Sequence, residues 1–313
     1  MITQDNTNTV MDIPEVDRKN AVAITLTFHK LGDQREGNID EMQTSADKGM
    51  MKAVKKLFGG EKEGDSNCSE FDAIKSFDGK MYRWLCDQSV PLLGRRNVRL
   101  ISSDAIATIE AKLVQAQKER SLLVNAFLKV YPIVIEAAKT KLNGQYNASD
   151  YPSVEAVGRK FSVDWNYLAL GIPDNLPDEV KKEAAAKVEN MWREAGEQIR
   201  DGLRIGFVKL VEHLLEKLTP APDGKAKRFY DTNVTNIISF IDTLAQRNLT
   251  NDKALVEVAN KAKALLVEYS QDCDKIKSDV KVRNSITASM SEIKAACDAM
   301  IGTEKRRKFQ LDG

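Results

Sequence analysis

The sequence has few of the residues on which most enzymes and metal proteins depend. It contains two histidines, His29 and His213, and neither has a His, Cys or carboxylate at a metal-ligand spacing. It also lacks a glycine-rich phosphate loop, a Gly-x-Ser-x-Gly turn and any sign of a Cys–His pair. These absences argue against an ATPase, a hydrolase or a metalloenzyme, so we expect a non-enzymatic protein without a cofactor.

Cysteines and long apolar runs are scarce as well. The four cysteines, Cys68, Cys86, Cys273 and Cys297, lie far apart, which suits small buried side chains in a reducing compartment better than a disulfide framework. The first residues have neither the basic flank nor the apolar core of a signal peptide. No run approaches the roughly 18 consecutive apolar residues of a membrane span. We therefore expect a soluble, cytoplasmic protein without a membrane partner.

No charge of one sign dominates. Lys and Arg number 47 against 46 Asp and Glu, so the formal net charge of +1 gives no global attraction for nucleic acid. Three local basic clusters are present, of which Arg95, Arg96 and Arg99 are the candidate contacts, with Tyr82 and Trp84 nearby in sequence. A solvated helix face explains such clusters better. The other two clusters are Lys52/Lys55/Lys56 and Lys305–Lys308.

The first third of the chain predicts a small α/β-like portion. Residues 1–20 are polar and predict a disordered lead-in. Ala21–Phe28 alternates apolar and small side chains, as a half-buried strand does, although no clear pairing partner follows; a loop packed on helices is the alternative. Helices are expected over about 40–58 and 70–88. This N-terminal portion spans 21–101.

The strongest periodic signal follows, over residues 104–141. A coiled-coil-like stripe at spacings of three and four predicts one long helix, in which Arg120 fills the one seam position without an apolar residue. Pro132 should kink it, and Asn143-Gly144 should end it. The apolar positions of this stripe are Ile106, Ile109, Leu113, Ala116, Leu123, Phe127, Val130, Val134 and Ala137.

An aromatic and proline-rich break, residues 143–180, separates this helix from a second long one. Its candidate interface residues are Tyr151, Pro152, Phe161, Trp165 and Tyr167, because aromatic side chains anchor many protein interfaces. The alternative is that these rings fill the space where two helices diverge, and we favour it. A short helix is expected from Pro152 to about Lys160.

The remainder predicts further long helices. Acidic residues at 178–179 favour a helix start there, and the apolar face continues to residue 218. Two more helical segments cover about 231–246 and 252–301, the last as one helix or two, before a basic tail at 304–313. The fold class is therefore mainly α: an elongated bundle of long antiparallel helices over 102–303, with the break inserted.

Several short motifs carry a family resemblance. Arg83-Trp84-Leu85 precedes Val90-Pro91, and Arg99-Leu100 follows Gly94. Asp150-Tyr151-Pro152-Ser153 precedes Phe161, and Asn233-Val234 and Asn248-Leu249 come later. With these motifs, the chain from about Ala21 to Ile301 resembles the phage and bacterial domain-of-unknown-function family numbered 3150.

The resemblance implies no catalytic residues. Members of that family are often encoded beside a MoxR-type AAA+ ATPase and a protein with a von Willebrand factor A domain, which implies an adaptor for such a machine. We therefore expect an interaction or adaptor protein, which, if it is phage-encoded, acts in the bacterial host cytoplasm. A nucleic-acid-binding accessory protein is the alternative. A homo-oligomer is also open, since a second copy could satisfy the coiled-coil-like stripe.

Overall fold

The computed structural model describes residues 16–36, 54–58, 68–92, 97–173, 175–220, 227–269 and 273–301, and they form a mainly α protein with two small sheets. The chain divides into two compact units. Unit 1 comprises 1–23, 87–105 and 168–313, and unit 2 comprises 24–86 and 106–167. Each unit is thus built from separate stretches of sequence, unlike the contiguous portions 21–101 and 102–303 expected above.

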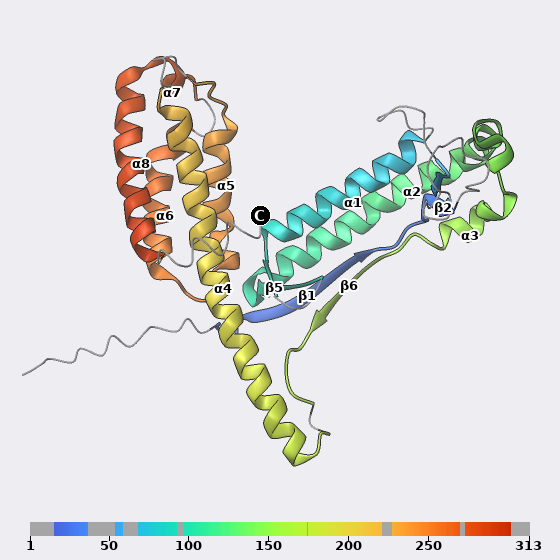
Figure 1. Cartoon of the computed structure of the whole chain (residues 1–313), viewed down its shortest axis with the longest axis horizontal. Helices are drawn as coiled ribbons and strands as arrows, with labels where there is room; N and C mark the ends of the chain where they lie inside the picture. The colour runs from blue at the N-terminus through green and yellow to red at the C-terminus, as the bar shows by residue number, and fades with distance from the viewer. Residues whose placement is uncertain are drawn as a thin grey trace, which may run out of the picture. The chain divides into compact units, whose positions relative to one another are not determined.

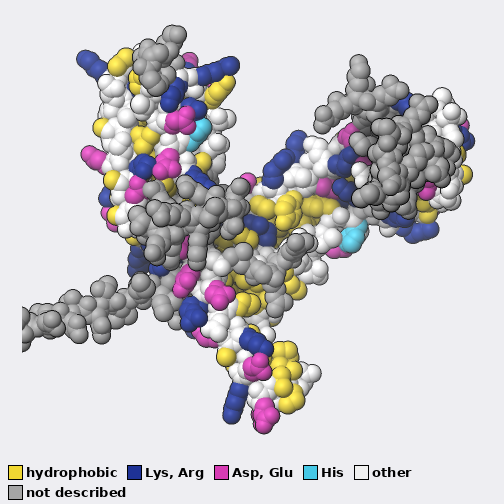
Figure 2. Space-filling model, viewed as in Figure 1, with side chains coloured by type: hydrophobic (Ala, Val, Ile, Leu, Met, Phe, Trp, Pro, Cys, Tyr) yellow, Lys and Arg dark blue, Asp and Glu magenta, His cyan; other side chains and the backbone are white. Residues whose placement is uncertain are grey.

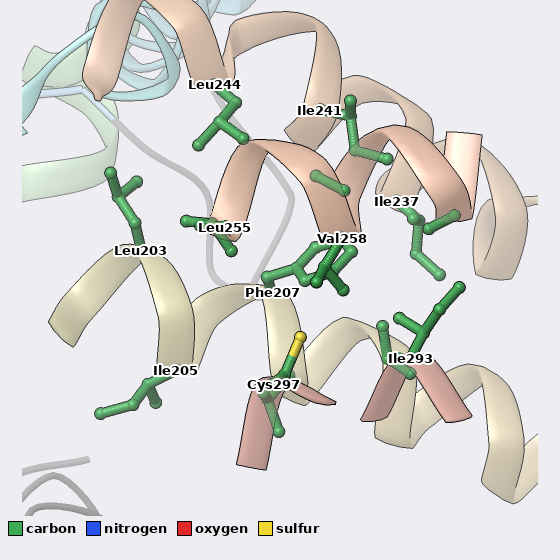
Figure 3. Close-up of a cluster of buried hydrophobic side chains, with 14 of the residues drawn as sticks. Leu203, Ile205, Phe207, Ile237, Ile241, Leu244, Leu255, Val258, Ile293 and Cys297 are labelled. Atoms are coloured by element: carbon green, nitrogen blue, oxygen red, sulfur yellow. The ribbon is translucent and has the colours of Figure 1, made fainter. Parts of the chain in front are cut away.

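Unit 1 is built around four helices (Figure 1). They are α4 (Asp178–Leu218), α5 (Thr232–Arg247), α6 (Lys253–Leu266) and α8 (Val280–Met300). α4 packs against α5 and α8, and α6 packs against the same two helices, so the four enclose one core. Figure 3 shows Phe207 of α4, Val258 of α6 and Ile293 of α8 among the side chains that meet there. This core is mostly aliphatic.

The two halves of α4 differ in burial. Every buried residue of this helix lies between Trp192 and Leu218, so its first fourteen residues bury no side chain. Two acidic residues, Asp178 and Glu179, occupy its first turn, where they interact favourably with the helix dipole. The observed bounds match the predicted helix at 178–218.

The last predicted helix, 252–301, is divided. α6 ends at Leu266, a turn of 3₁₀ helix (Val267–Tyr269) and the short α7 (Asp274–Ser278) follow, and α8 then runs to Met300. Asp279 caps α8 by accepting from the backbone N–H groups of Lys281 and Val282. The weak apolar pattern around residues 278–285 coincides with this new helix start.

An ion pair fastens α4 to the start of α6 within unit 1. Arg204 donates from Nε and Nη2 to the carboxylate of Asp252, at 2.6 and 3.0 Å, and from Nη1 to the carbonyl of Met300 at 2.8 Å. Asp252 also caps α6 by accepting from the Leu255 N–H. Burial opposes charge on Asp252, but the bonds from Arg204 and Leu255 outweigh it and hold the Asp252 pKa below its usual value.

Unit 2 is organised around α1 (Ser69–Asp87) and the long α2 (Ile106–Leu142), which lie side by side (Figure 1). Its core is rich in aromatic rings, among them Phe58, Phe71, Phe127 and Tyr131. The short helix α3 (Val154–Gly158), capped by the Ser153 hydroxyl, packs against α2. The helices predicted at 70–88, 104–141 and 152–160 are therefore present.

The buried stripe of α2 departs from the predicted one after Arg120. Buried residues follow spacings of four and three up to Ala116, but two spacings of four then occur in succession, from Ala116 to Arg120 and on to Val124. Beyond that point the predicted Phe127 and Val134 are buried, but Val124, Tyr131 and Ala138 are buried in place of the predicted Leu123, Val130 and Ala137. The average spacing is therefore close to the 3.6 residues of a straight helix rather than the 3.5 of a coiled coil.

The predicted strand is confirmed as β1 (Ala21–Phe28), and its pairing partners are strands that the sequence analysis missed. The sheet order is β4-β5-β1-β6, with β4 at Val90–Pro91, β5 at Val98–Ser102 and β6 at Val163–Leu168. β4 and β5 pair antiparallel. Residues 24–28 of β1 and residues 163–167 of β6 both belong to unit 2.

Two predictions for the N-terminal portion need correction. Of the helix predicted at 40–58, residues 40–53 lie outside the described part, but Val54–Lys56 is a strand, β3, paired antiparallel with β2 (Gln34–Glu36). At Val54–Lys56 the pairing with β2, rather than the helical spacing of apolar residues, determines the conformation. At the predicted disordered lead-in, Val16 is buried and the Asp17 N–H donates to the Leu249 carbonyl at 2.9 Å. Residues 1–15 and the basic tail 304–313 lie outside the described residues.

Candidate protein-interaction site

The structure places two of the five candidate interface residues in the core of unit 2. Tyr151 is buried, and Phe161 is half-buried against Phe71 and Phe127, with ring centroids 6.5 and 5.7 Å away. Phe58 contacts Tyr151 from the other side at 6.3 Å. Edge-to-face pairs of this kind add to the energy of burial. Both rings thus have a packing role that explains their presence without a partner.

Tyr151 and Pro152 are tied to the rest of unit 2 by hydrogen bonds. The Tyr151 hydroxyl donates to the Leu57 carbonyl at 3.2 Å, and the Pro152 carbonyl accepts from the Tyr131 hydroxyl at 3.1 Å. Tyr151 also stacks on Tyr146, with centroids 5.3 Å apart. Burial raises the pKa of both Tyr131 and Tyr151 to about 12, since their phenolate forms would lose solvation.

Trp165 and Tyr167 lie instead on β6, and one carboxylate of α2 holds both. The indole Nε1 of Trp165 donates to Glu110 Oε2 at 2.8 Å, and the Tyr167 hydroxyl donates to the same oxygen at 2.9 Å. Tyr167 remains 38% exposed. Of the five candidates, these two are therefore a fixed pair of rings at the surface.

A groove of about 440 Å³ runs between α2 and the start of β6. Its apolar wall includes Val124, Leu128, Phe161 and Val163, and its rim is polar. The remaining lining residues are Gln117, Lys118, Arg120, Ser121, Asn125, Gly158, Ser162 and Asp164. The groove thus joins one predicted interface residue, Phe161, to helix residues for which no such role was predicted.

Arg120, at the inner end of this groove, forms the most enclosed ion pair among the described residues. It donates to the Asp78 carboxylate from Nε at 2.7 Å and from Nη2 at 3.1 Å, and it bonds the carbonyls of His29 and Ser162. The two side chains are 3% and 8% exposed. An arginine within an apolar stripe was the signal in the sequence, but its partner on α1 carried none. With its donors directed to protein acceptors, Arg120 organises unit 2.

The opposite side of α2 carries a line of exposed apolar residues among polar ones. Judged by length and composition alone, the helical segment Ser103–Gln145 is long and apolar enough to cross a membrane. Of its most apolar 18-residue window, 28% is buried, so most of that window is not covered by the described chain. Leu122 is 71% and Ile133 is 70% exposed. Eleven residues are close to three helical turns, so these two side chains lie on one line, with exposed Ala126 and Lys129 between them. In Figure 2, hydrophobic side chains gather along α1 and α2 and at the segment before α4.

Of the predicted basic contacts Arg95, Arg96 and Arg99, only Arg99 is among the described residues. Arg95 and Arg96 lie outside the described residues, as do Lys52, the Lys55 and Lys56 side chains and Lys305–Lys308. Arg99 lies on β5, where it donates from Nε to the Ser89 hydroxyl at 2.5 Å and from Nη2 to the Ser89 carbonyl at 3.1 Å. Arg99 thus links β5 to the residue that precedes β4, within unit 1.

Reactive side chains are dispersed over the described part of the chain. No group of three or more His, Cys, Asp or Glu residues that could hold a metal occurs there. The four cysteines are free thiols, and burial raises the pKa of Cys297 to about 11, which makes its thiolate scarce at neutral pH. His29 pairs with Asp164 at 3.1 Å on the surface, where both side chains are 55% exposed.

Comparison with known proteins adds no relative. No family model matches the chain, and no match was found among curated proteins or among solved structures.

Proposed function

We propose that this chain is a non-enzymatic interaction or adaptor protein, and that the open stripe of α2 (Leu122, Ala126, Lys129 and Ile133) is its main docking face. The observation that carries the proposal is the exposure of Leu122 and Ile133, each about seven-tenths open on one line of the helix. Neither residue belongs to the hydrophobic clusters of the described chain. Exposed apolar patches of this kind mark binding surfaces.

The shape of the stripe favours a helix as the occupant. Positions 122, 126, 129 and 133 follow the four-three-four spacing with which an amphipathic helix packs along another. Lys129 interrupts the apolar line, and Glu136 and Lys139 pair just beyond it at 2.5 Å. We propose a partner helix whose apolar face carries an acidic residue opposite Lys129. A bilayer would have to accommodate the same charges at a cost.

The resemblance to the family numbered 3150 suggests the identity of the partner. In this proposal it is a MoxR-type AAA+ ATPase acting with a von Willebrand factor A protein, and the chain presents substrates or components to that machine. The elongated antiparallel bundle, the bacterial cytoplasmic location and a phage origin are further parts of the same proposal.

The introduction of negative charge on the stripe tests the docking face. Leu122→Glu with Ile133→Glu should abolish recovery of the ATPase from nuclease-treated host extract, and direct binding to the purified ATPase should weaken at least about tenfold. Val180→Glu with Ala186→Glu is the matched control, because both residues are apolar and exposed but lie on α4. The control should bind like the wild type. Exposed positions tolerate such changes, so both variants should keep the wild-type melting temperature.

Three outcomes would reject the proposal. Equal loss of binding in the control variant would mean that charge alone, not the stripe, is responsible. Binding to lipid vesicles that the stripe variant abolishes would assign α2 to a membrane. Binding to nucleic acid with a steep salt dependence and no recovered ATPase would favour the nucleic-acid alternative.

A further inference from the structure

Strand β6 is an edge strand with little of the usual protection. It is the last strand in the order β4-β5-β1-β6, so among the described residues it has one strand neighbour, β1. Its sequence, Val-Asp-Trp-Asn-Tyr-Leu, contains neither Lys nor Pro, which commonly blunt an exposed edge, and Asp164 is its one charged residue. The second side of β6 thus offers backbone donors and acceptors to another strand.

The hydrogen bond before β6 shows which backbone groups face that open side. The Ser162 carbonyl accepts from the His29 N–H at 2.9 Å, so Ser162 is directed toward β1. Successive residues of a strand direct their N–H and C=O groups to opposite neighbours. Asp164 and Asn166 therefore face β1, and the backbone groups of Val163, Trp165 and Tyr167 face the open edge.

The side chains of β6 divide in the same alternation. Val163 lines the groove beside α2, and Trp165 and Tyr167 are held toward α2 by Glu110. Asp164 and Asn166 fall on the other face of the strand, and both are exposed. The edge is therefore ordered before any partner arrives, which lowers the entropic cost of binding.

We propose that β6 pairs antiparallel with β6 of a second copy of this chain, with Trp165 on the two-fold axis. In this register Val163 lies opposite Tyr167 of the partner subunit, and Trp165 lies opposite Trp165 of the partner subunit. All three residues whose backbone faces the edge then exchange both of their hydrogen bonds. Asp164 lies opposite Asn166 of the partner subunit, whose amide can donate to the carboxylate.

The alternative registers are worse for identifiable reasons. Moving the centre one residue toward Val163 places Asp164 directly opposite Asp164 of the partner subunit, and like charges in that position are destabilising. Moving it one residue toward Leu168 leaves Val163 without a partner residue in β6. Charge and hydrogen bonding thus select one self-complementary register, as a two-fold interface requires.

The dimer should be weak. Two paired strands of this length bury less than the roughly 1,200 Å² at the lower end of stable interfaces, even with the groove beside Val163 partly filled. We therefore expect a reversible dimer that forms at micromolar concentrations. This surface is separate from the open stripe of α2, so the proposal does not depend on the function proposed above.

A charge swap tests the register. Sedimentation of the full chain up to about 200 µM should show a monomer–dimer equilibrium. Asn166→Asp opposes two carboxylates at each of two symmetric contacts and should raise the dissociation constant at least about tenfold. Asp164→Asn combined with Asn166→Asp restores one charge per pair and should recover the wild-type constant. Leu122→Glu with Ile133→Glu should leave it unchanged.

Cross-linking gives a second readout. In a Cys86→Ser background, Trp165→Cys should form a disulfide dimer under mild oxidation, because directly opposite residues have Cα atoms about 5.5 Å apart. Asn166→Cys should not, since its counterpart lies diagonally across. A wild type that stays monomeric over the whole range overturns the proposal. So does a dimer that Asn166→Asp does not weaken, or one that cross-links equally through both positions.

Discussion

The two units reach a buried core by different chemistry. Unit 1 packs mainly Leu, Ile and Val side chains from four helices, with Phe207 and Phe240 as a single ring pair at 5.7 Å. The core of unit 2 has fewer buried residues and relies on aromatic rings. Phe58 and Phe127 each take part in four ring pairs. A small core thus gains from large side chains, because each ring buries more area than an aliphatic group.

Both units nevertheless contain one buried arginine–aspartate pair, and the pairs differ in enclosure. Arg120 and Asp78 of unit 2 are 3% and 8% exposed, whereas Arg204 and Asp252 of unit 1 are 14% and 3% exposed. The Arg204 side chain is therefore more open to water than that of Arg120, so loss of its carboxylate should cost less. The stability of variants in these two pairs tests the difference between the units.

The largest effect is expected for Asp78→Ala. It leaves the Arg120 guanidinium buried without its carboxylate, which should cost about 3–5 kcal/mol of unfolding free energy. Asp252→Ala would also remove the N-cap of α6, so the matched comparison is Asp252→Asn against Asp78→Asn, in which Asp252→Asn should cost less because Arg204 is more exposed. Chemical denaturation of both variants measures the difference. An equal loss in the two variants would show that enclosure does not decide the cost.

The second effect concerns the aromatic core. Phe127→Leu nearly conserves volume but removes four ring pairs, so it should cost about 2 kcal/mol. Phe207→Leu removes one ring pair and should cost about half as much. Thermal unfolding of the two variants provides the measurement. A larger loss for Phe207→Leu would contradict the proposed role of the rings in unit 2.

The third effect is alkaline sensitivity of unit 2. The pKa of Tyr131 and Tyr151 is raised to about 12, above the ordinary value of 10, so their stabilising contribution is complete below pH 10 and is lost as the pH rises to 12. Tyr151→Phe should reduce this loss, at a cost near 1 kcal/mol at neutral pH for the bond to Leu57. Stability measured between pH 9 and about 12 tests it; an unchanged pH profile in Tyr151→Phe would refute the assignment.

The smallest effect is acid sensitivity of unit 1. The Asp252 pKa is lowered in the folded state, so the contribution of Asp252 is present above its ordinary pKa of about 4 and disappears as the pH falls through the folded value. Asp252→Asn keeps an N-cap for α6 and should flatten the stability profile below about pH 4. If the variant and the wild type lose stability in parallel there, other carboxylates control the acid response.

Long periodic segments could be predicted from the sequence, whereas residues positioned by tertiary contacts could not. The bounds 178–218 were predicted for α4 because two acidic residues mark its start and apolar residues recur at helical spacing from Val188 to Leu218. β6 was missed although Val163, Trp165 and Tyr167 alternate along it, since its partner β1 is more than a hundred residues away. The buried phase of α2 was misassigned after Arg120 because only Asp78, on another helix, explains a buried arginine there.

The candidate site was predicted in part. The five aromatic-segment residues were identified, but nothing in the sequence separates the packed Tyr151 and Phe161 from Trp165 and Tyr167, which Glu110 holds at the surface. The open stripe of α2 was not predicted, because Leu122 and Ile133 lie outside the periodic apolar pattern of that helix. Exposure depends on which neighbours a helix acquires, and a single sequence does not show them.

The way in which the chain divides between the units has a consequence for synthesis. The boundaries at residues 23, 86, 105 and 167 mean that unit 2 has its last residue once Tyr167 has been made, while unit 1 still lacks α4, α5, α6 and α8. A chain growing from its N-terminus can therefore complete the aromatic core first. The early segments of unit 1, including β4 and β5, gain the rest of their hydrophobic core only after α8 has been made.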